Sequence, residues 1–120
     1  MSRKPEERIA DMIQCCRKIL RFTSGLNQAQ LAEDELATDA VLRNIEIIGE
    51  ATKHLSIDVR ARMPDIEWKK IAGMRDWLSH GYDRADPDII WSVVESKIPE
   101  LLRTLYPFED EQGRGSREPS

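Results

Sequence analysis

The sequence predicts an all-α protein, a bundle of four main helices with one or two short helices between them. Three observations predict this class. Apolar residues recur at alternating steps of three and four along most of the chain, which is the period of one helix face. Residues that cap helix starts, and Gly or Pro residues that end helices, separate these periodic stretches. The chain has 120 residues, of which 40% are hydrophobic and 33% charged, as is typical of a single globular domain.

The first long helix is expected over about residues 6–22. Its apolar stripe consists of Ile9, Met12, Ile13, Cys16, Ile19 and Leu20. Gly25 and Asn27 end this helix, and Asn27 can act as the N-cap of a short helix over residues 28–33.

The second long helix is expected to begin at Thr38 as its N-cap and to end near residue 54. Its apolar seam consists of Ala37, Val41, Ile45, Ile48, Thr52 and Leu55. Further apolar residues lie off this seam, which indicates a helix in the middle of a bundle or one that faces a second chain. The small residues Gly49 and Ala51 would permit another helix to approach closely.

A short helix over residues 57–62 and a longer helix follow. Ser56 can cap the short one, which ends at Pro64. The longer helix is expected to begin near residue 65 or 67 and to end at Gly81, because glycine accepts the left-handed conformation after a helix end. One of its faces carries Trp68, Ile71, Arg75 and Leu78.

The final helix has a strong start signal, with Asp86 as N-cap and Pro87 at the first helical position. It is expected to run to about Leu105, with Pro99 kinking it or removing one backbone hydrogen bond. The chain then becomes acidic and finally rich in Gly, Ser and Arg. We therefore expect a helical domain over residues 1–106 and a disordered tail over residues 107–120.

The composition argues against several classes of protein. The chain contains no run of about 18 apolar residues that could cross a membrane, and its polar N-terminus does not resemble a secretory signal, so a cytoplasmic location is expected. The net charge of −4 argues against nonspecific coating of nucleic acid. Cations outnumber acids over residues 60–84, which would suit a local basic cleft, although such runs are more often solvated surface.

No metal or cofactor is expected. Cys15 and Cys16 are adjacent, and neighbours on a helix point about 100° apart, so a disulfide between them is geometrically poor. With His54 and His80 as the two histidines, the chain shows no zinc-ligand spacing. We expect both cysteines to be reduced and to lie in or beside the core.

The segment from Arg75 to Tyr82 carries the candidate chemistry. It places a guanidinium, the His80 imidazole and a phenol within eight residues. On an ideal helix His80 would lie about 140° from Arg75, whereas unwinding near Gly81 would bring the two together. An arginine can bind a phosphate, a histidine can move protons near neutral pH, and RNA supplies its own 2′-hydroxyl nucleophile. These residue types also suit a purely structural pairing at a helix end.

Arg75, His80 and Tyr82 match the Arg-x4-His-x-Tyr motif of the HEPN superfamily, in its HepT-like branch. Residues 43–51, 68–76 and 88–94 also resemble that branch, and the resemblance spans about residues 6–106. It implies a HEPN-type helical bundle. It also implies the toxin of a type VII-like toxin–antitoxin pair, a metal-independent endoribonuclease that acts on RNA as a homodimer.

The resemblance further implies roles for single residues. Arg75 and His80 would be catalytic, and Tyr82 would accept AMP from a minimal nucleotidyltransferase antitoxin, which would block the RNA site. Asp76 and Ser79 are candidate supporting residues, with surface or capping roles as the alternative. Asn44 and Glu46 are weaker candidates, and both are expected on the solvated side of their helix.

Two other readings stay open at this point. The chain could be a non-catalytic helical adaptor that binds a nucleotidyltransferase and helps to present substrate or nucleotide, with Arg75 holding a phosphate. It could also be a plain dimerising bundle in which Arg75 and His80 are structural.

Overall fold

The computed structural model describes residues 4–78 and 86–113, with backbone but no side chain described at residues 75, 77, 78 and 109–113. All regular structure in these ranges is helical, which confirms the predicted all-α class. None of the described helices is long and apolar enough to cross a membrane. The elements are α1 (Pro5–Thr23), α2 (Gln28–Glu33), α3 (Glu35–Lys53), α4 (Ile57–Ala61), α5 (Trp68–Leu78), α6 (Pro87–Ser92), the π-helix η1 (Val93–Lys97) and α7 (Ile98–Gly113).

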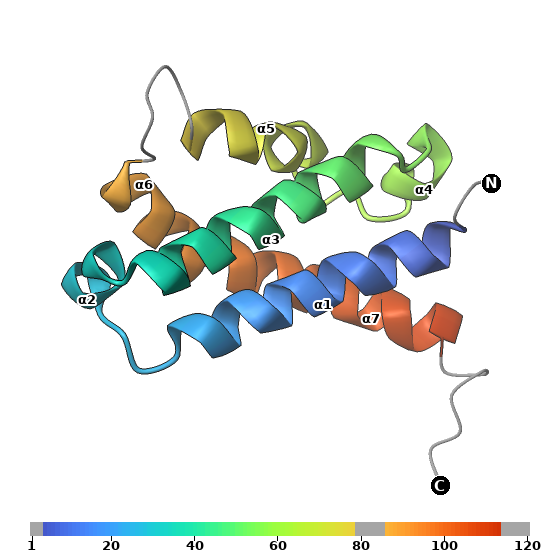
Figure 1. Cartoon of the computed structure of the whole chain (residues 1–120). Helices are drawn as coiled ribbons and strands as arrows, with labels where there is room; N and C mark the ends of the chain where they lie inside the picture. Colours follow the sequence, from blue (N-terminus) through green and yellow to red (C-terminus); the bar gives the residue numbers. More distant parts are fainter. Residues whose placement is uncertain (1–3, 79–85, 114–120) are drawn as a thin grey trace, which may run out of the picture.

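Helices α1 and α3 lie side by side and run in opposite directions (Figure 1). Helix α5 packs on α3, and α7 packs on α1. The short helix α2 contacts both α3 and α6. Figure 1 shows α2 and α6 at one end of the bundle, whereas α4, the start of α1 and the end of α7 lie at the other.

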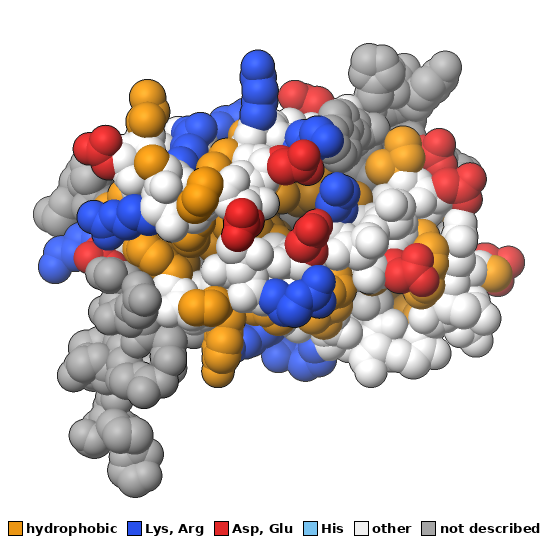
Figure 2. Space-filling view, turned by 180° about the vertical axis from the view of Figure 1, so that it is seen from behind, with side chains coloured by type: hydrophobic (Ala, Val, Ile, Leu, Met, Phe, Trp, Pro, Cys, Tyr) orange, Lys and Arg blue, Asp and Glu red, His pale blue; other side chains and the backbone are white. Residues whose placement is uncertain are grey.

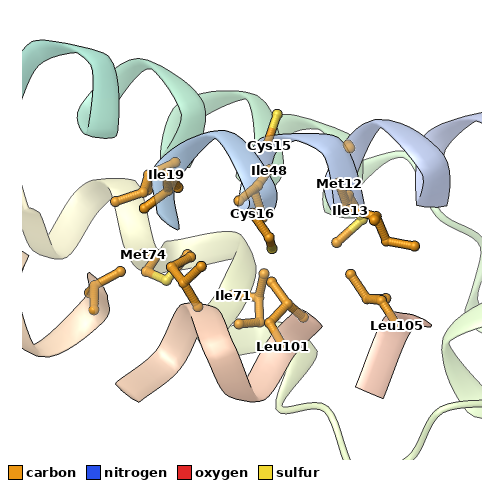
Figure 3. Close-up of a cluster of buried hydrophobic side chains, with 14 of the residues drawn as sticks. Met12, Ile13, Cys15, Cys16, Ile19, Ile48, Ile71, Met74, Leu101 and Leu105 are labelled. Carbon is orange, nitrogen blue, oxygen red and sulfur yellow. The ribbon is translucent and has the colours of Figure 1, made fainter. Parts of the chain in front are cut away.

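The core forms where the apolar stripes of the four long helices meet. Figure 3 shows Met12, Ile13 and Cys16 of α1 pointing toward side chains of α5 and α7. The predicted seam of the second long helix is buried along its whole length, at Ala37, Val41, Ile45, Ile48, Thr52 and Leu55. Helix α5 contributes Ile71 and Met74. The three-and-four spacing therefore identified the buried faces correctly.

Three predicted N-caps are confirmed by their hydrogen bonds. Asn27 Oδ1 accepts from the backbone N–H of Gln30 at 2.8 Å and begins α2. Ser56 Oγ accepts from the N–H of Val59 at 3.2 Å and begins α4. The side chain of Asp86, which precedes α6, accepts from the N–H of Asp88 at 2.9 Å.

The predicted start of the second long helix at Thr38 is wrong. Helix α3 begins at Glu35, and Asp34 is its N-cap, with Oδ1 accepting from the N–H of Ala37 at 2.9 Å. The Thr38 hydroxyl instead donates to the carbonyl of Leu31 at 2.8 Å and ties α3 to α2. Aspartate is the stronger N-cap, and here it both ends α2 and begins α3.

The disturbance predicted at Pro99 takes the form of a wide turn. The N–H of Ile98 bonds to the carbonyl of Val93, five residues earlier, and η1 ends at Lys97, two residues before the proline. Proline has no N–H to donate, and its ring crowds the carbonyl four residues before it. A π-turn relieves both problems without ending the helix.

The predicted end of the final helix near Leu105 is wrong, because α7 continues through Pro107 to Gly113. Phe108 continues the apolar stripe of Leu101 and Leu105 at helical spacing and is buried, which stabilises the extra turns. The disorder predicted for residues 107–113 is therefore wrong, because these residues are helical. Residues 114–120 lie outside the described residues. The disorder predicted for residues 114–120 and the domain boundary at residue 106 stay predictions.

The close helix approach predicted at Gly49 is present. A Cβ atom on Gly49 would lie 3.4 Å from the carbonyl oxygen of Ala72 and 3.9 Å from that of Ile71. The backbone of α5 therefore lies directly on α3 at this point. By contrast, a Cβ atom on Gly73 would meet nothing within 4 Å.

The close contact at Gly49 can be tested by replacing this glycine with residues of different size. We expect Gly49→Leu to lower the free energy of unfolding by about 1–3 kcal/mol, because the larger side chain would push α5 away from α3. Gly49→Ala should raise it by up to about 1 kcal/mol, since the added methyl group makes an ordinary contact and alanine favours helices. Urea denaturation measures both. Gly73→Leu is the matched control in open space, and an equal loss of stability at both positions would contradict the close contact.

Candidate active site

Helix α5 carries the first residue of the candidate motif. Arg75 lies in the last turns of α5, where its backbone but not its side chain is described. Ser79, His80 and Tyr82 lie outside the described residues, in the segment 79–85 that connects α5 to α6, as does the predicted helix end at Gly81. The position of the motif in the fold is therefore a junction between two described helices.

The start of α5 is fixed by Trp68. Its indole Nε1–H donates to the carbonyls of Arg60 at 3.0 Å and Met63 at 3.1 Å, and its ring is buried. These bonds tie the first turn of α5 to the end of α4. A core tryptophan whose N–H has partners is a rigid anchor.

Position 75 lies on the same side of α5 as two buried residues. Trp68 and Ile71 are buried on this side, and position 75 follows them by seven and four residues, within about 40° around an ideal helix. Gly49 meets the α5 backbone at Ile71 and Ala72. Arg75 is thus carried by the turn of α5 that follows this fixed contact.

The candidate supporting residues of α3 differ in their surroundings. Asn44 is buried, contrary to the expectation of a solvated side chain, and its Nδ2 donates to the Ala40 carbonyl at 2.8 Å within the same helix. It lies three residues after Val41, at the edge of the buried seam. Glu46 is half-buried, and its Oε1 lies 3.3 Å from Nη1 of Arg43.

Of the two supporting candidates on α3, Glu46 lies nearer the level of position 75 along the helix axes. Helices α3 and α5 run in opposite directions, so residues before Gly49 lie at the level of residues after Ile71 (Figure 1). Glu46 precedes Gly49 by three residues, and position 75 follows Ile71 by four. Asp76 is exposed, one residue further along α5.

The comparisons with known proteins decide the family. A family model described as "Ribonuclease HepT-like" matches residues 12–107. The chain belongs to this family. No solved structure matches it.

Three relatives of this HepT-like chain are similar over most of their own length. A Caldanaerobacter subterraneus protein described as "Putative RNase" is 35% identical over 84% of this chain and 90% of the relative. A Methanocaldococcus jannaschii protein with the same description is 29% identical over 79% of this chain and 87% of the relative. A Thermococcus cleftensis protein described as "Probable ribonuclease HepT" is 34% identical over 84% of this chain and 92% of the relative.

Membership of the HepT-like family confirms the resemblance inferred from the motif at residues 75–82 and its flanking stretches. The matched range includes α5, α6 and the segment between them. The roles of Arg75, His80 and Tyr82 are not assigned by these comparisons and stay predictions.

The cation-rich run of the HepT-like chain is partly engaged in local contacts. Arg60 Nε donates to the Leu55 carbonyl at 3.2 Å, which supports the turn before α4. Lys70 Nζ lies 3.3 Å from a carboxylate oxygen of Glu67, and Lys97 Nζ lies 4.0 Å from the other. These pairs are exposed, so each stabilises the fold by less than about 1 kcal/mol.

The two thiols are poor candidates for catalytic groups. Cys16 points toward the side chains of α5 and α7, and Cys15 points to the other side of α1 (Figure 3). Both are buried and free. Burial raises the pKa of the Cys16 thiol to about 12 and also raises the pKa of Cys15. Both therefore stay protonated near neutral pH, and a thiol is a weak nucleophile. Among residues 4–78 and 86–113, no group of three His, Cys, Asp or Glu is arranged to hold a metal ion.

We expect Ellman's reagent at pH 7.5 to label the native thiols far more slowly than the same thiols in urea, with Cys16 slowest. Because the folded pKa of Cys16 is raised, its contribution to the free energy of unfolding is complete below about pH 9, the unfolded value, and falls as the pH rises toward 12. Cys15→Ala assigns the faster thiol. Rapid native labelling at both positions would contradict the burial.

Proposed function

We propose that this chain is a metal-independent endoribonuclease, the toxin of a type VII-like toxin–antitoxin pair in the cytoplasm. One observation carries the proposal: a chain that belongs to the ribonuclease HepT-like family contains Arg75, His80 and Tyr82 at the motif's spacing. Relatives described as RNases, similar over most of the chain, support the activity.

The proposed chemistry uses the nucleophile that RNA itself carries. Arg75 binds the scissile phosphate through two N–H groups and stabilises the negative charge that develops on it. His80 takes the proton of the 2′-hydroxyl as general base. The 2′-oxygen then forms a bond to phosphorus, the bond to the 5′-oxygen breaks, and the leaving oxygen takes up a proton. The products are a 2′,3′-cyclic phosphate and a 5′-hydroxyl, and no step requires a metal ion.

The fold supports this division of roles. Arg75 is carried by a helix whose start is anchored by Trp68 and whose middle is fixed at Gly49. His80 follows Arg75 by five residues in the sequence, in the segment that joins α5 to α6 and lies outside the described residues. A fixed phosphate ligand with a proton-transferring group beside it is the arrangement that phosphate-transfer chemistry needs.

The proposed partners are a second copy of the chain, RNA, and a minimal nucleotidyltransferase antitoxin. A two-fold dimer would place two Arg75–His80 pairs near one RNA-binding cleft and concentrate positive charge on a protein that is acidic as a whole. AMP transferred to Tyr82 would add an anionic phosphodiester and a purine next to that cleft. The modified chain would then exclude RNA phosphate from Arg75.

The catalytic roles are tested with total cellular RNA in EDTA. We expect wild type to cleave it, and His80→Ala and Arg75→Ala each to lose at least about 100-fold in rate, because general acid–base and charge-stabilising groups contribute that much or more. Their thermal stability should stay close to that of wild type. His54→Ala is the matched control, since His54 is exposed and lies near Glu50 at the end of α3.

Unmodified wild type that leaves RNA intact would contradict the ribonuclease and favour the adaptor. A large drop in thermal stability in both active-site variants, with cleavage retained, would point instead to structural roles for Arg75 and His80.

The role of Tyr82 is tested by mass spectrometry after incubation with the nucleotidyltransferase and ATP. We expect AMP on Tyr82 and a matching loss of RNA cleavage, because the adduct occupies the phosphate site. Tyr82→Phe should remain unmodified and active in the same mixture. Tyr106→Phe is the control, since Tyr106 is the other tyrosine and is half exposed. Modification of Tyr106, or an active chain with AMP on Tyr82, would refute this mode of inhibition.

A further inference from the structure

A hollow of about 500 Å³ lies between α2, the first turns of α3, and α6; we call it the α2–α6 pocket. Its apolar lining includes Leu31, Leu42 and Ile90, and its carboxylates are Glu33, Glu35 and Asp39. The volume is in the range of pockets that hold drug-sized ligands, so it can take more than one side chain of a partner.

The surroundings of the α2–α6 pocket are uniformly acidic. Every ionisable residue in the ranges 22–42 and 86–92 is Asp or Glu. In Figure 2 this end of the molecule, at the right, carries Asp and Glu and no Lys or Arg among its coloured atoms. Glu33, Glu35 and Asp39 are exposed, and none of them forms an ion pair with another described residue. RNA phosphate is therefore repelled here, whereas a cation is attracted.

The walls of the α2–α6 pocket are held together by side-chain hydrogen bonds. Gln28 Nε2 donates to Asp88 Oδ1 at 2.6 Å and joins α2 to α6 across 60 residues of sequence. Thr38 Oγ1 donates to the Leu31 carbonyl at 2.8 Å and joins α3 to α2. A preformed pocket of this kind binds without a large ordering cost.

Apolar surface extends beyond the acidic rim. Leu36, the residue after Glu35, is 82% exposed and adds apolar surface beside the acidic residues. A polyamine would satisfy the carboxylates but has no bulky apolar group for Leu42 and Leu36. A protein segment that carries both kinds of side chain fits better, with an apolar side chain against these leucines and a Lys or Arg charge at the rim.

We propose that the α2–α6 pocket docks a basic, partly apolar segment of the nucleotidyltransferase partner. The inference rests on the proposed function and adds the surface through which that partner binds. Pro87 lines the pocket, and Tyr82 precedes it by five residues, which span at most about 18 Å when fully extended. A nucleotidyltransferase held at the pocket is thus kept within a short distance of Tyr82, which raises its effective concentration there.

The test uses the purified full-length chain and the nucleotidyltransferase encoded beside it. The variant is the double charge reversal Glu35→Lys with Asp39→Lys. We expect its dissociation constant for the nucleotidyltransferase to rise at least about tenfold, with slower AMP transfer to Tyr82, because two attractive charges become repulsive. RNA cleavage without the partner should not change. Leu36→Ser should weaken binding severalfold through the loss of apolar contact.

Glu6→Lys is the matched control. Like Glu35, Glu6 is an exposed acid in the first turn of a 19-residue helix, so both reversals have a similar effect on helix stability. It lies at the opposite end of the bundle (Figure 1). We expect wild-type binding and AMP transfer from this control.

Each contrary outcome points to a specific failure. A double variant that binds the nucleotidyltransferase and is modified like wild type overturns the docking site. The docking site is also overturned if the double variant keeps this binding and loses only the binding of spermidine, a polyamine, or only self-association of the chain. A wild type that cleaves RNA but does not bind the nucleotidyltransferase also overturns it, while the ribonuclease activity stands. A wild type that neither cleaves RNA nor accepts AMP refutes the proposed function, and the docking site with it.

Discussion

The contact between Gly49 and the backbone of α5 sets the geometry of the rest of the molecule. Because α3 has no side chain at this point, the carbonyls of Ile71 and Ala72 come within ordinary contact distance of a Cβ atom placed on Gly49. That approach lets Ile71 and Met74 reach the core that α1 and α7 also line. Position 75 follows one turn later, so a close packing contact fixes the backbone that carries the first residue of the motif.

A second constraint is the wide turn before Pro99, which lets one continuous run of helix serve two packing partners. Helix α6 contacts α2 at one end of the bundle, and α7 packs along α1 toward the other. The π-turn places one more residue in its turn and so shifts the buried face by about 100° relative to an ideal helix. Val93 and Val94 at the start of this turn and Ile98 at its end are all buried. The proline therefore sets where the two halves of this helix can differ in direction.

Local signals in the sequence were sufficient to predict most of the helices and part of the candidate site. Asn27, Ser56 and Asp86 act within four residues of themselves, so their caps could be predicted without any tertiary information. The end of α7 could not be predicted in this way, because the burial of Phe108 depends on contacts outside its own helix. Asn44 was misplaced because periodicity does not define the edge of a buried stripe. The α2–α6 pocket could not be predicted either, since residues 28–42 and 87–90 form it only after α2 and α6 meet.

The arrangement of charge bears on how an AMP group on Tyr82 would inhibit the enzyme. Residues 79–85 follow the end of α5 at Leu78, three residues after Arg75, and precede α6, whose first residue Pro87 lines the acidic α2–α6 pocket. The phosphodiester of an adenylylated tyrosine is an anion, so the carboxylates of that pocket repel it, and a guanidinium attracts it. The acidic pocket that would bind the basic segment of the antitoxin would therefore also repel the phosphate of the AMP group on Tyr82. Electrostatics would direct the new group toward Arg75, the proposed binding site of the RNA phosphate. Docking of the antitoxin and inhibition would then both depend on the separation of acidic and basic surface.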